Sequence, residues 1–231
     1  MQFDLANAES TLGVNFKNKQ LLEQAFIHRS YLNEHPEVTL QHNERLEFLG
    51  DAVLELVITD WLFRTYKDKA EGELTSLRSA LVNTGSISSV ASELSLNDFL
   101  LLSKGEAKDT GRARAFILAN TFEAVIGAIY LDQGYDNARD FITKHLIPRT
   151  EEIIAKRLWL DPKSYFQEKA QETNGVTPNY KVISESGPDH AKTFTIGLYI
   201  GNDLVVEGKG PSKQEAEQEA AKLGLEKKGW R

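Results

Sequence analysis

Apolar side chains recur along the first two thirds of the chain at the three- and four-residue spacing of α-helices. The pattern predicts helices over residues 21–28, 43–66, 70–96, 115–130 and 136–155, with a charged loop over residues 103–111. The run LDPKS at 160–164 interrupts it, and proline there begins a new element. The remainder predicts a helix over 164–173, alternating strands over 180–184, 193–200 and 203–208, and a helix over 212–226. We therefore expect a multidomain chain, with an all-α domain over residues 1–158 and an α-β-β-β-α domain over residues 161–231.

The longest predicted helix carries three acidic residues, Glu44, Glu47 and Asp51, on one face. Each like-charged pair at this spacing costs about 0.2–0.5 kcal/mol. Gly50, in the middle of the helix, costs about another 1 kcal/mol relative to alanine. A helix that accepts both penalties is either an ordinary solvated face or a cation site packed closely against another element.

The strongly apolar helix predicted over 115–130 is interrupted by Asn120 and Glu123. A buried carboxylate without a partner is costly, so these groups need neighbours. One interpretation pairs the charge with an arginine such as Arg45 or Arg78. In the other, this helix packs against the longest helix, and four oxygen-bearing side chains surround hard cations: Glu47, Asp51, Asn120 and Glu123. Ligands of this kind suit Mg²⁺ or Mn²⁺.

Composition narrows the possibilities further. The 231-residue chain has 41% hydrophobic and 26% charged residues, which is ordinary for a globular protein with a core in each domain. It has no cysteine, so disulfides and thiolate metal sites are excluded. The N-terminal residues lack the features of a signal peptide, and no apolar run approaches the ~20 residues that span a bilayer. We expect a cytoplasmic location and no membrane partner. The net charge of −7 argues against a simple nucleic-acid-binding protein.

Several segments resemble the ribonuclease III family of double-stranded-RNA endonucleases. They are residues 21–31, the run NERLEFLGD at 43–51, the run EGEL at 71–74 with Arg78, and residues 117–130. The likeness covers nearly the whole chain, in order and at the expected spacing. It implies an Mg²⁺-dependent endoribonuclease, with Mn²⁺ as a possible substitute, that acts in RNA processing. Such an enzyme hydrolyses duplex RNA by two-metal-ion catalysis and leaves 5′-phosphate and 3′-hydroxyl ends with 3′ overhangs.

By resemblance, five acidic residues form the catalytic site: Glu47, Asp51 and Glu123 as metal ligands, with Glu44 and Glu71 as supporting groups. The fourth metal-site position is normally aspartate in the family, and here it is Asn120, so the site loses one negative charge. An amide oxygen can still coordinate Mg²⁺. We expect an active enzyme that needs more Mg²⁺ or prefers Mn²⁺. The alternative is a catalytically weakened or inactive homologue that acts as a double-stranded-RNA-binding protein.

The resemblance also implies a homodimer and answers the objection from charge, because bound cations offset an acidic cleft that faces a polyanion. Phe48 and Gly50 are expected at the two-fold interface, where glycine permits a close approach. The alternative for Phe48 is a contact within the core of its own domain. His28 and His42 are expected to be structural, since hydrolysis of this kind requires no histidine nucleophile.

The region from about residue 161 resembles a double-stranded-RNA-binding domain, which reads the shape of ~16 bp of duplex. The matching segments are 162–168, the run GPDH at 187–190 with Lys192 and Phe194, and 208–221. The residues expected to contact RNA are Gln167, Glu168, His190, Lys192, Lys209, Ser212 and Lys213. Ser212 is also expected to cap the last helix. From residue 161 onward there are 10 Lys and Arg against 11 Asp and Glu, and Gln214 stands where the family usually has another basic residue. We expect a local basic edge, modest affinity and strong salt sensitivity.

Overall fold

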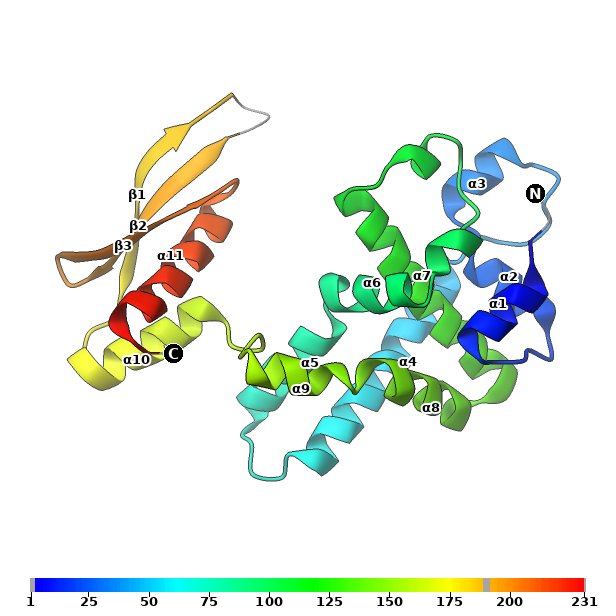
Figure 1. Cartoon of the computed structure of the whole chain (residues 1–231), viewed down its shortest axis with the longest axis horizontal. Helices are drawn as coiled ribbons and strands as arrows, with labels where there is room; N and C mark the ends of the chain where they lie inside the picture. The colour runs from blue at the N-terminus through cyan, green and yellow to red at the C-terminus, as the bar shows by residue number, and fades with distance from the viewer. Residues whose placement is uncertain (1–2, 189–191, 231) are drawn as a thin grey trace. The chain divides into compact units, whose positions relative to one another are not determined.

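The computed structural model describes residues 3–188 and 192–230, and it divides into two compact units, Met1–Trp159 and Leu160–Arg231 (Figure 1). The first unit is built from helices. The second holds a three-stranded antiparallel sheet with a helix before and a helix after it in the chain. The predicted fold class, an all-α domain followed by an α-β-β-β-α domain, is confirmed.

The helical unit contains nine α-helices and two short 3₁₀ helices among its described residues. They are α1 (Leu5–Leu12), α2 (Lys19–Ala25), α3 (Arg29–Glu34), α4 (Glu44–Thr65), α5 (Glu71–Val82), α6 (Thr84–Glu93), η1 (Leu96–Phe99), η2 (Glu106–Lys108), α7 (Arg112–Gln133), α8 (Tyr135–Leu146) and α9 (Arg149–Ala155). The two longest helices, α4 and α7, cross at the centre of the unit and form its main packing contact (Figure 1). Their fully buried side chains include Leu54, Ile58, Phe122 and Ile129.

Two predicted helices prove to be broken. The stretch 70–96 is two helices, α5 and α6, because Asn83 adopts an extended backbone (φ −71°, ψ 157°) and its side chain accepts a hydrogen bond from the Ser86 amide at 2.9 Å. This is the geometry of an N-cap, which starts a new helix. The stretch 136–155 is likewise divided into α8 and α9 at Ile147 and Pro148. Helices α1 and α3 were not predicted.

Helix α7 is long and apolar enough, by length and composition, to cross a membrane. Its most apolar window is 61% buried inside the unit, and the core helix of a globular domain passes the same test. Asn120 and Glu123 interrupt its apolar run. We therefore describe α7 as the core helix of this unit.

The second unit comprises α10 (Pro162–Asn174), β1 (Asn179–Ser186), β2 (Thr193–Ile200), β3 (Asp203–Gly210) and α11 (Lys213–Lys228), with strand order β1-β2-β3. Pro162 is the first residue of α10, and the Asp161 side chain caps that helix by accepting from the Ser164 amide at 2.8 Å. Both helices contribute to one core, in which Phe166, Leu198 and Leu225 are buried. The irregular pairing between Val182 and Ser184 marks a β-bulge in β1.

Candidate active site

Two glycines allow α4 and α7 to cross with their backbones in contact. A Cβ atom added to Gly50 would lie 1.8 Å from the carbonyl oxygen of Glu123, and one added to Gly127 would lie 2.2 Å from that of Leu46. Any larger side chain at either position would push the helices apart. The close approach that Gly50 permits is therefore made with α7 of its own chain, against which Gly50 is buried. Its expected place at the two-fold interface stays a prediction.

The crossing brings the acidic face of α4 to the polar positions of α7. Burial, followed by the charges of Asp51 and Glu47, raises the pKa of Glu123 from its ordinary 4.5 to about 8. Burial and the charges of Glu44 and Asp51 also raise the pKa of Glu47, and a hydrogen bond with the Asn120 amide partly offsets that rise. Carboxylates perturb one another in this way only at short range. The structure thus gathers Glu47, Asp51, Asn120 and Glu123 at one place.

The two supporting acidic residues differ in how close they lie to this group. Glu44, one turn before Glu47, approaches the Arg29 guanidinium at 3.5 Å. Glu71 belongs to α5, where its carboxylate accepts a hydrogen bond from the Thr75 hydroxyl at 3.0 Å. Glu71 is not among the charges that raise the pKa values of Glu47 and Glu123. Within one chain, Glu44 borders the acidic group and Glu71 does not.

Among the described residues, no cationic side chain pairs with the carboxylates of the acidic group. Across residues 3–188 and 192–230, neither Glu47, Asp51 nor Glu123 forms an ion pair. Arg78, one of the arginines considered as a partner for Glu123, instead pairs with Glu55 at 3.1 Å, and the other, Arg45, is exposed.

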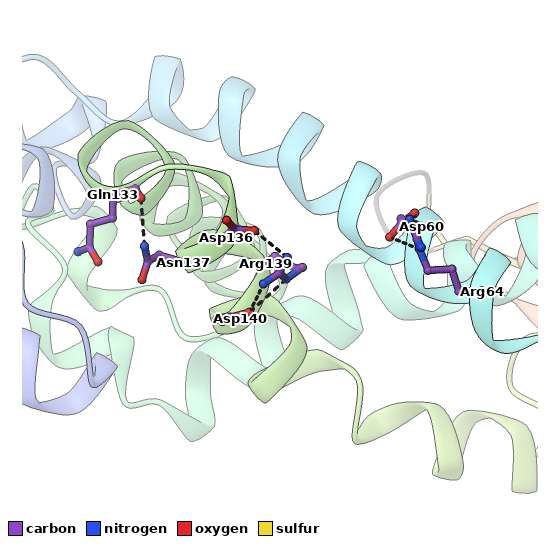
Figure 2. Close-up of polar contacts among 7 residues, drawn as sticks. All are labelled: Asp60, Arg64, Gln133, Asp136, Asn137, Arg139 and Asp140. Atoms are coloured by element: carbon purple, nitrogen blue, oxygen red, sulfur yellow. Dashed lines mark hydrogen bonds and ion pairs between the residues drawn. The ribbon is translucent and has the colours of Figure 1, made fainter.

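Some other acidic residues of the helical unit form local ion pairs. Asp60 binds Arg64 within α4, and Arg139 of α8 binds both Asp136 and Asp140 (Figure 2). The group at the crossing differs from these pairs, because its carboxylates are partly buried beside one another and form no salt bridge among the described residues. Its stability requires protons or an external cation.

The donors fit a hard divalent cation in kind and in charge. Three carboxylates and one amide offer only oxygen ligands on the side facing the crossing, which suits Mg²⁺ or Mn²⁺. Among the described residues, no three acidic or histidine side chains are already close enough to hold a metal ion as they stand. The group is therefore assembled by the fold but would have to close around a bound ion through side-chain rotation.

The two histidines near the group hold structural positions. His28 is the N-cap of α3, with Nδ1 2.8 Å from the Ser30 hydroxyl, and burial lowers its pKa. His42 precedes α4, with Nδ1 3.8 Å from the Glu44 carboxylate. Neither ring is a partner of Glu123.

Next to the acidic group, α4 presents an apolar stripe to solvent. Phe48, Leu56 and Phe63 are 81%, 56% and 71% exposed, and their spacing places them on one side of the helix. Phe48 is therefore not a contact within its own core, which was the alternative considered for it. Beside the stripe lies a cavity of about 250 Å³ lined by Thr59, Leu62, Phe63, Glu71, Leu74, Thr75 and Arg78.

In the second unit, the expected RNA-contacting residues that the structure describes lie on α10, just before β2, on β3 and at the start of α11. Gln167 and Glu168 line an open groove of about 660 Å³ along α10. Ser212 caps α11 as expected, since its hydroxyl accepts from the Glu215 amide at 3.1 Å. Lys209 and Lys213 are exposed at the same end of this helix. Lys192 is exposed just before β2, and His190 lies outside the described residues.

Sequence reasoning missed three residues that shape these surfaces. Gly127 carries the second half of the helix crossing, and its only signal was a small residue one turn after Glu123. Arg29 restrains Glu44, and Glu185 of β1 lies 3.4 Å from Lys213. Neither of these pairs has a local sequence signal, because the partners come from different elements.

Both units are similar to known protein families. Residues 18–150 match the ribonuclease-III-like family, and residues 162–228 match the double-stranded RNA binding motif. Ribonuclease 3 of Carboxydothermus hydrogenoformans is 48% identical over 223 residues, which is 96% of this chain and 95% of that protein. The solved nuclease domain of ribonuclease III from Campylobacter jejuni is 38% identical with a TM-score of 0.57, covering 64% of this chain and 97% of that one. A second structure of that domain, described as showing structural flexibility in a region involved in dimer formation, is 39% identical with a TM-score of 0.55, covering 63% and 99%.

The acidic crossing in a helical unit, followed by an α-β-β-β-α unit, defines a nuclease that carries its own RNA-binding domain. The matches cover both units in the same order as in full-length relatives. The chain belongs to the ribonuclease III family, and it is an endoribonuclease that acts on double-stranded RNA.

Proposed function

We propose that this endoribonuclease depends on Mg²⁺, or on Mn²⁺ as a substitute, held by the acidic group at the α4–α7 crossing. The observation that carries the proposal is the meeting of Glu47, Asp51 and Glu123 from two helices, where no cationic side chain in the described part of the chain pairs with them. A site that gathers negative charge is suited to a polyanionic substrate only when cations join it.

In this proposal each residue at the crossing has a distinct role. Glu123, the most buried of the acids, and Glu47 would hold the ions through their carboxylates, and Asp51 would fix their spacing from the exposed side of α4. Asn120 would contribute its side-chain oxygen. Bound at these groups, two Mg²⁺ ions would supply the Lewis acidity that activates water and stabilises the leaving 3′ oxygen. The products would carry 5′-phosphate and 3′-hydroxyl ends.

The active form would be a homodimer that pairs through the apolar stripe of α4. An exposed row of Phe48, Leu56 and Phe63 is unusual on an isolated surface, and burying it would be favourable by about 25 cal/mol per Å² of apolar area. The Campylobacter jejuni nuclease domain is described as having a region involved in dimer formation, which supports the same assembly here. Two sites facing one duplex would cut both strands and leave 3′ overhangs.

The cavity beside the stripe suggests how Glu71 joins the site. In a two-fold pairing of α4, Phe48 of one subunit would enter the cavity lined by Phe63, Leu74 and Glu71 of its partner. Phe48 directly follows Glu47, so this contact would bring Glu71 of one subunit to the acidic group of the other. This would reconcile the supporting role expected of Glu71 with its separation from Glu47 within one chain.

The second unit would hold the duplex through shape rather than sequence. Gln167 and Glu168 on the exposed side of α10 would meet the 2′-hydroxyls of one minor groove, and the amino end of α11 would face the phosphates. We further propose a cytoplasmic role in the processing of ribosomal and messenger RNA.

Cleavage of a long duplex RNA with and without Mg²⁺ tests the proposed metal dependence. Replacement of Glu123 by glutamine should lower the rate on the order of 100-fold, because a ligand charge is lost. Glu151→Gln, the same change on an exposed residue of α9, is the matched control and should cleave normally. Equal rates for the two variants, or full cleavage in excess chelator, would contradict the proposal.

A second candidate is a protein that binds duplex RNA but cleaves it weakly or not at all. Asn120 favours it, because this residue removes one charge from the site and engages Glu47 through its amide. The same cleavage gel separates the two candidates: duplex RNA retarded by the protein yet intact at high Mg²⁺ would select the binding protein.

A further inference from the structure

Lys213, at the start of α11, is held by neighbours on the sheet. Its ammonium nitrogen lies 3.4 Å from a carboxylate oxygen of Glu185 on β1 and 5.6 Å from the centre of the Phe194 ring on β2. Glu185 and Phe194 are directly opposite each other in the β1–β2 register. The lysine therefore sits over a cross-strand pair that supplies both an aromatic face and a negative charge.

Glu185 occupies a place where an RNA phosphate would be expected. Lys213 lies in the first turn of a 16-residue helix whose free amide groups and dipole also favour an anion. Both members of the pair are solvent-accessible, with side chains 58% and 41% exposed, so an incoming phosphate can reach the ammonium group. An RNA phosphate and the Glu185 carboxylate cannot both bind the same side of the Lys213 ammonium group without repelling each other.

The surrounding charge makes this competition significant. Two other lysines of the unit are also committed to carboxylates, Lys163 to Glu217 at 2.6 Å and Lys169 to Glu172 at 2.7 Å. With 10 Lys and Arg against 11 Asp and Glu from residue 161 onward, the unit has no net positive charge to attract RNA. The state of Lys213 therefore weighs heavily in its electrostatic attraction for RNA.

We propose that Glu185 is an intramolecular competitor of the RNA backbone for Lys213, and that it sets the affinity of the binding domain for duplex RNA. In the RNA-free protein, the Glu185 carboxylate forms an ion pair with the Lys213 ammonium group. When RNA binds, a phosphate replaces the Glu185 carboxylate beside Lys213. Breaking the Lys213–Glu185 ion pair costs free energy, which weakens the complex with RNA. The inference rests on the proposed RNA contact of Lys213.

The test measures binding of a 20-bp RNA duplex to the full-length protein at several salt concentrations, with Ca²⁺ in place of Mg²⁺. Because an exposed ion pair of this kind is weak, Glu185→Gln should tighten binding about 2- to 5-fold at low salt. The affinity should then also fall more steeply with salt, since Lys213 is free to displace a counterion. Glu207→Gln, the same change on an exposed β3 residue that forms no ion pair among the described residues, is the matched control.

Further variants separate this inference from the contact on which it rests. Lys213→Ala should weaken binding, and adding Glu185→Gln to that variant should have no more effect than Glu207→Gln. If Lys213→Ala binds as the unaltered protein does, the proposed RNA contact fails, and the inference fails with it. If Lys213→Ala weakens binding while Glu185→Gln and Glu207→Gln behave alike, Glu185 is not a competitor, and the RNA contact stands.

Discussion

At the scale of single residues, the acidic group combines charges that repel one another with burial that makes each charge more costly. Glu123 shows both effects, because it projects from the mostly buried middle of α7, beside the carboxylates of α4. Its neighbours Asp51 and Glu47 lie on a different helix, so the repulsion depends on how tightly α4 and α7 pack. The same arrangement that would bind a cation therefore destabilises the cation-free fold.

This repulsion should appear as pH-dependent stability in chelator. The pKa of Glu123 is about 8 in the fold and ordinary in the unfolded chain, so its unfavourable ionisation begins above pH 4.5 and is complete above pH 8. Glu123→Gln should have the unaltered stability at pH 4.5 and be more stable by on the order of 3 kcal/mol at pH 8.5, after allowance for partial solvent screening. Urea denaturation at the two pH values measures this. A difference that does not change with pH would contradict the assigned shift.

Asn120 should set the concentration of Mg²⁺ that the enzyme needs. Asn120→Asp restores a fourth negative charge, so we expect the Mg²⁺ concentration for half-maximal cleavage to fall roughly 10-fold. The matched control is Asn137→Asp on α8, where the amide donates to the Gln133 carbonyl at 3.0 Å and the charge change is identical (Figure 2). An unchanged Mg²⁺ dependence in Asn120→Asp would refute a limiting role for the amide.

At the scale of elements, the decisive feature is the contact between the backbones of α4 and α7. Gly50 and Gly127 face each other's helices, and the atoms that a Cβ would meet are backbone atoms, which cannot rotate away. The crossing therefore sets the separation between the carboxylates of α4 and those of α7. Burial of the surrounding side chains, including Leu54 and Phe122, holds the two helices in place.

Gly127→Ala should destabilise the helical unit although alanine is the better helix former. Its Cβ would lie 2.2 Å from the Leu46 carbonyl oxygen, so the helices must separate, at a cost of about 1–3 kcal/mol. Gly72→Ala in α5 is the control, because nothing lies within 4 Å of its added Cβ, and it should be neutral or stabilising by up to about 1 kcal/mol. Thermal denaturation compares the two. Equal effects would show that the crossing tolerates a larger separation.

At the scale of the whole molecule, the exposed stripe of α4 predicts assembly. Leu56 is 56% exposed within the stripe, and Leu131 of α7 is 53% exposed outside it. Leu56→Asp should yield monomers in sedimentation and lose most cleavage activity, since a buried charge disfavours the interface. Leu131→Asp should leave both properties unchanged. Dimers of Leu56→Asp as stable as those of the control would place the interface elsewhere.

Sequence by itself determined the features that depend on neighbours within one or two turns. Residues three or four apart share a helix face, so the grouping of Glu44, Glu47 and Asp51, and of Asn120 with Glu123, followed from spacing alone. The change of hydrophobic period after residue 160 likewise indicated a second unit with three strands, and Ser212 was identified as a cap.

Only the tertiary structure decided what depends on residues far apart in the chain. It placed Gly50 against α7 of its own chain, it separated Glu71 from the acidic group, and it set Glu185 beside Lys213. The physical reason is that the periodicity of a sequence shows which side of a helix or strand is apolar. Which other element packs against that side is decided by tertiary packing. Repulsion between carboxylates on two helices exists only once those helices meet.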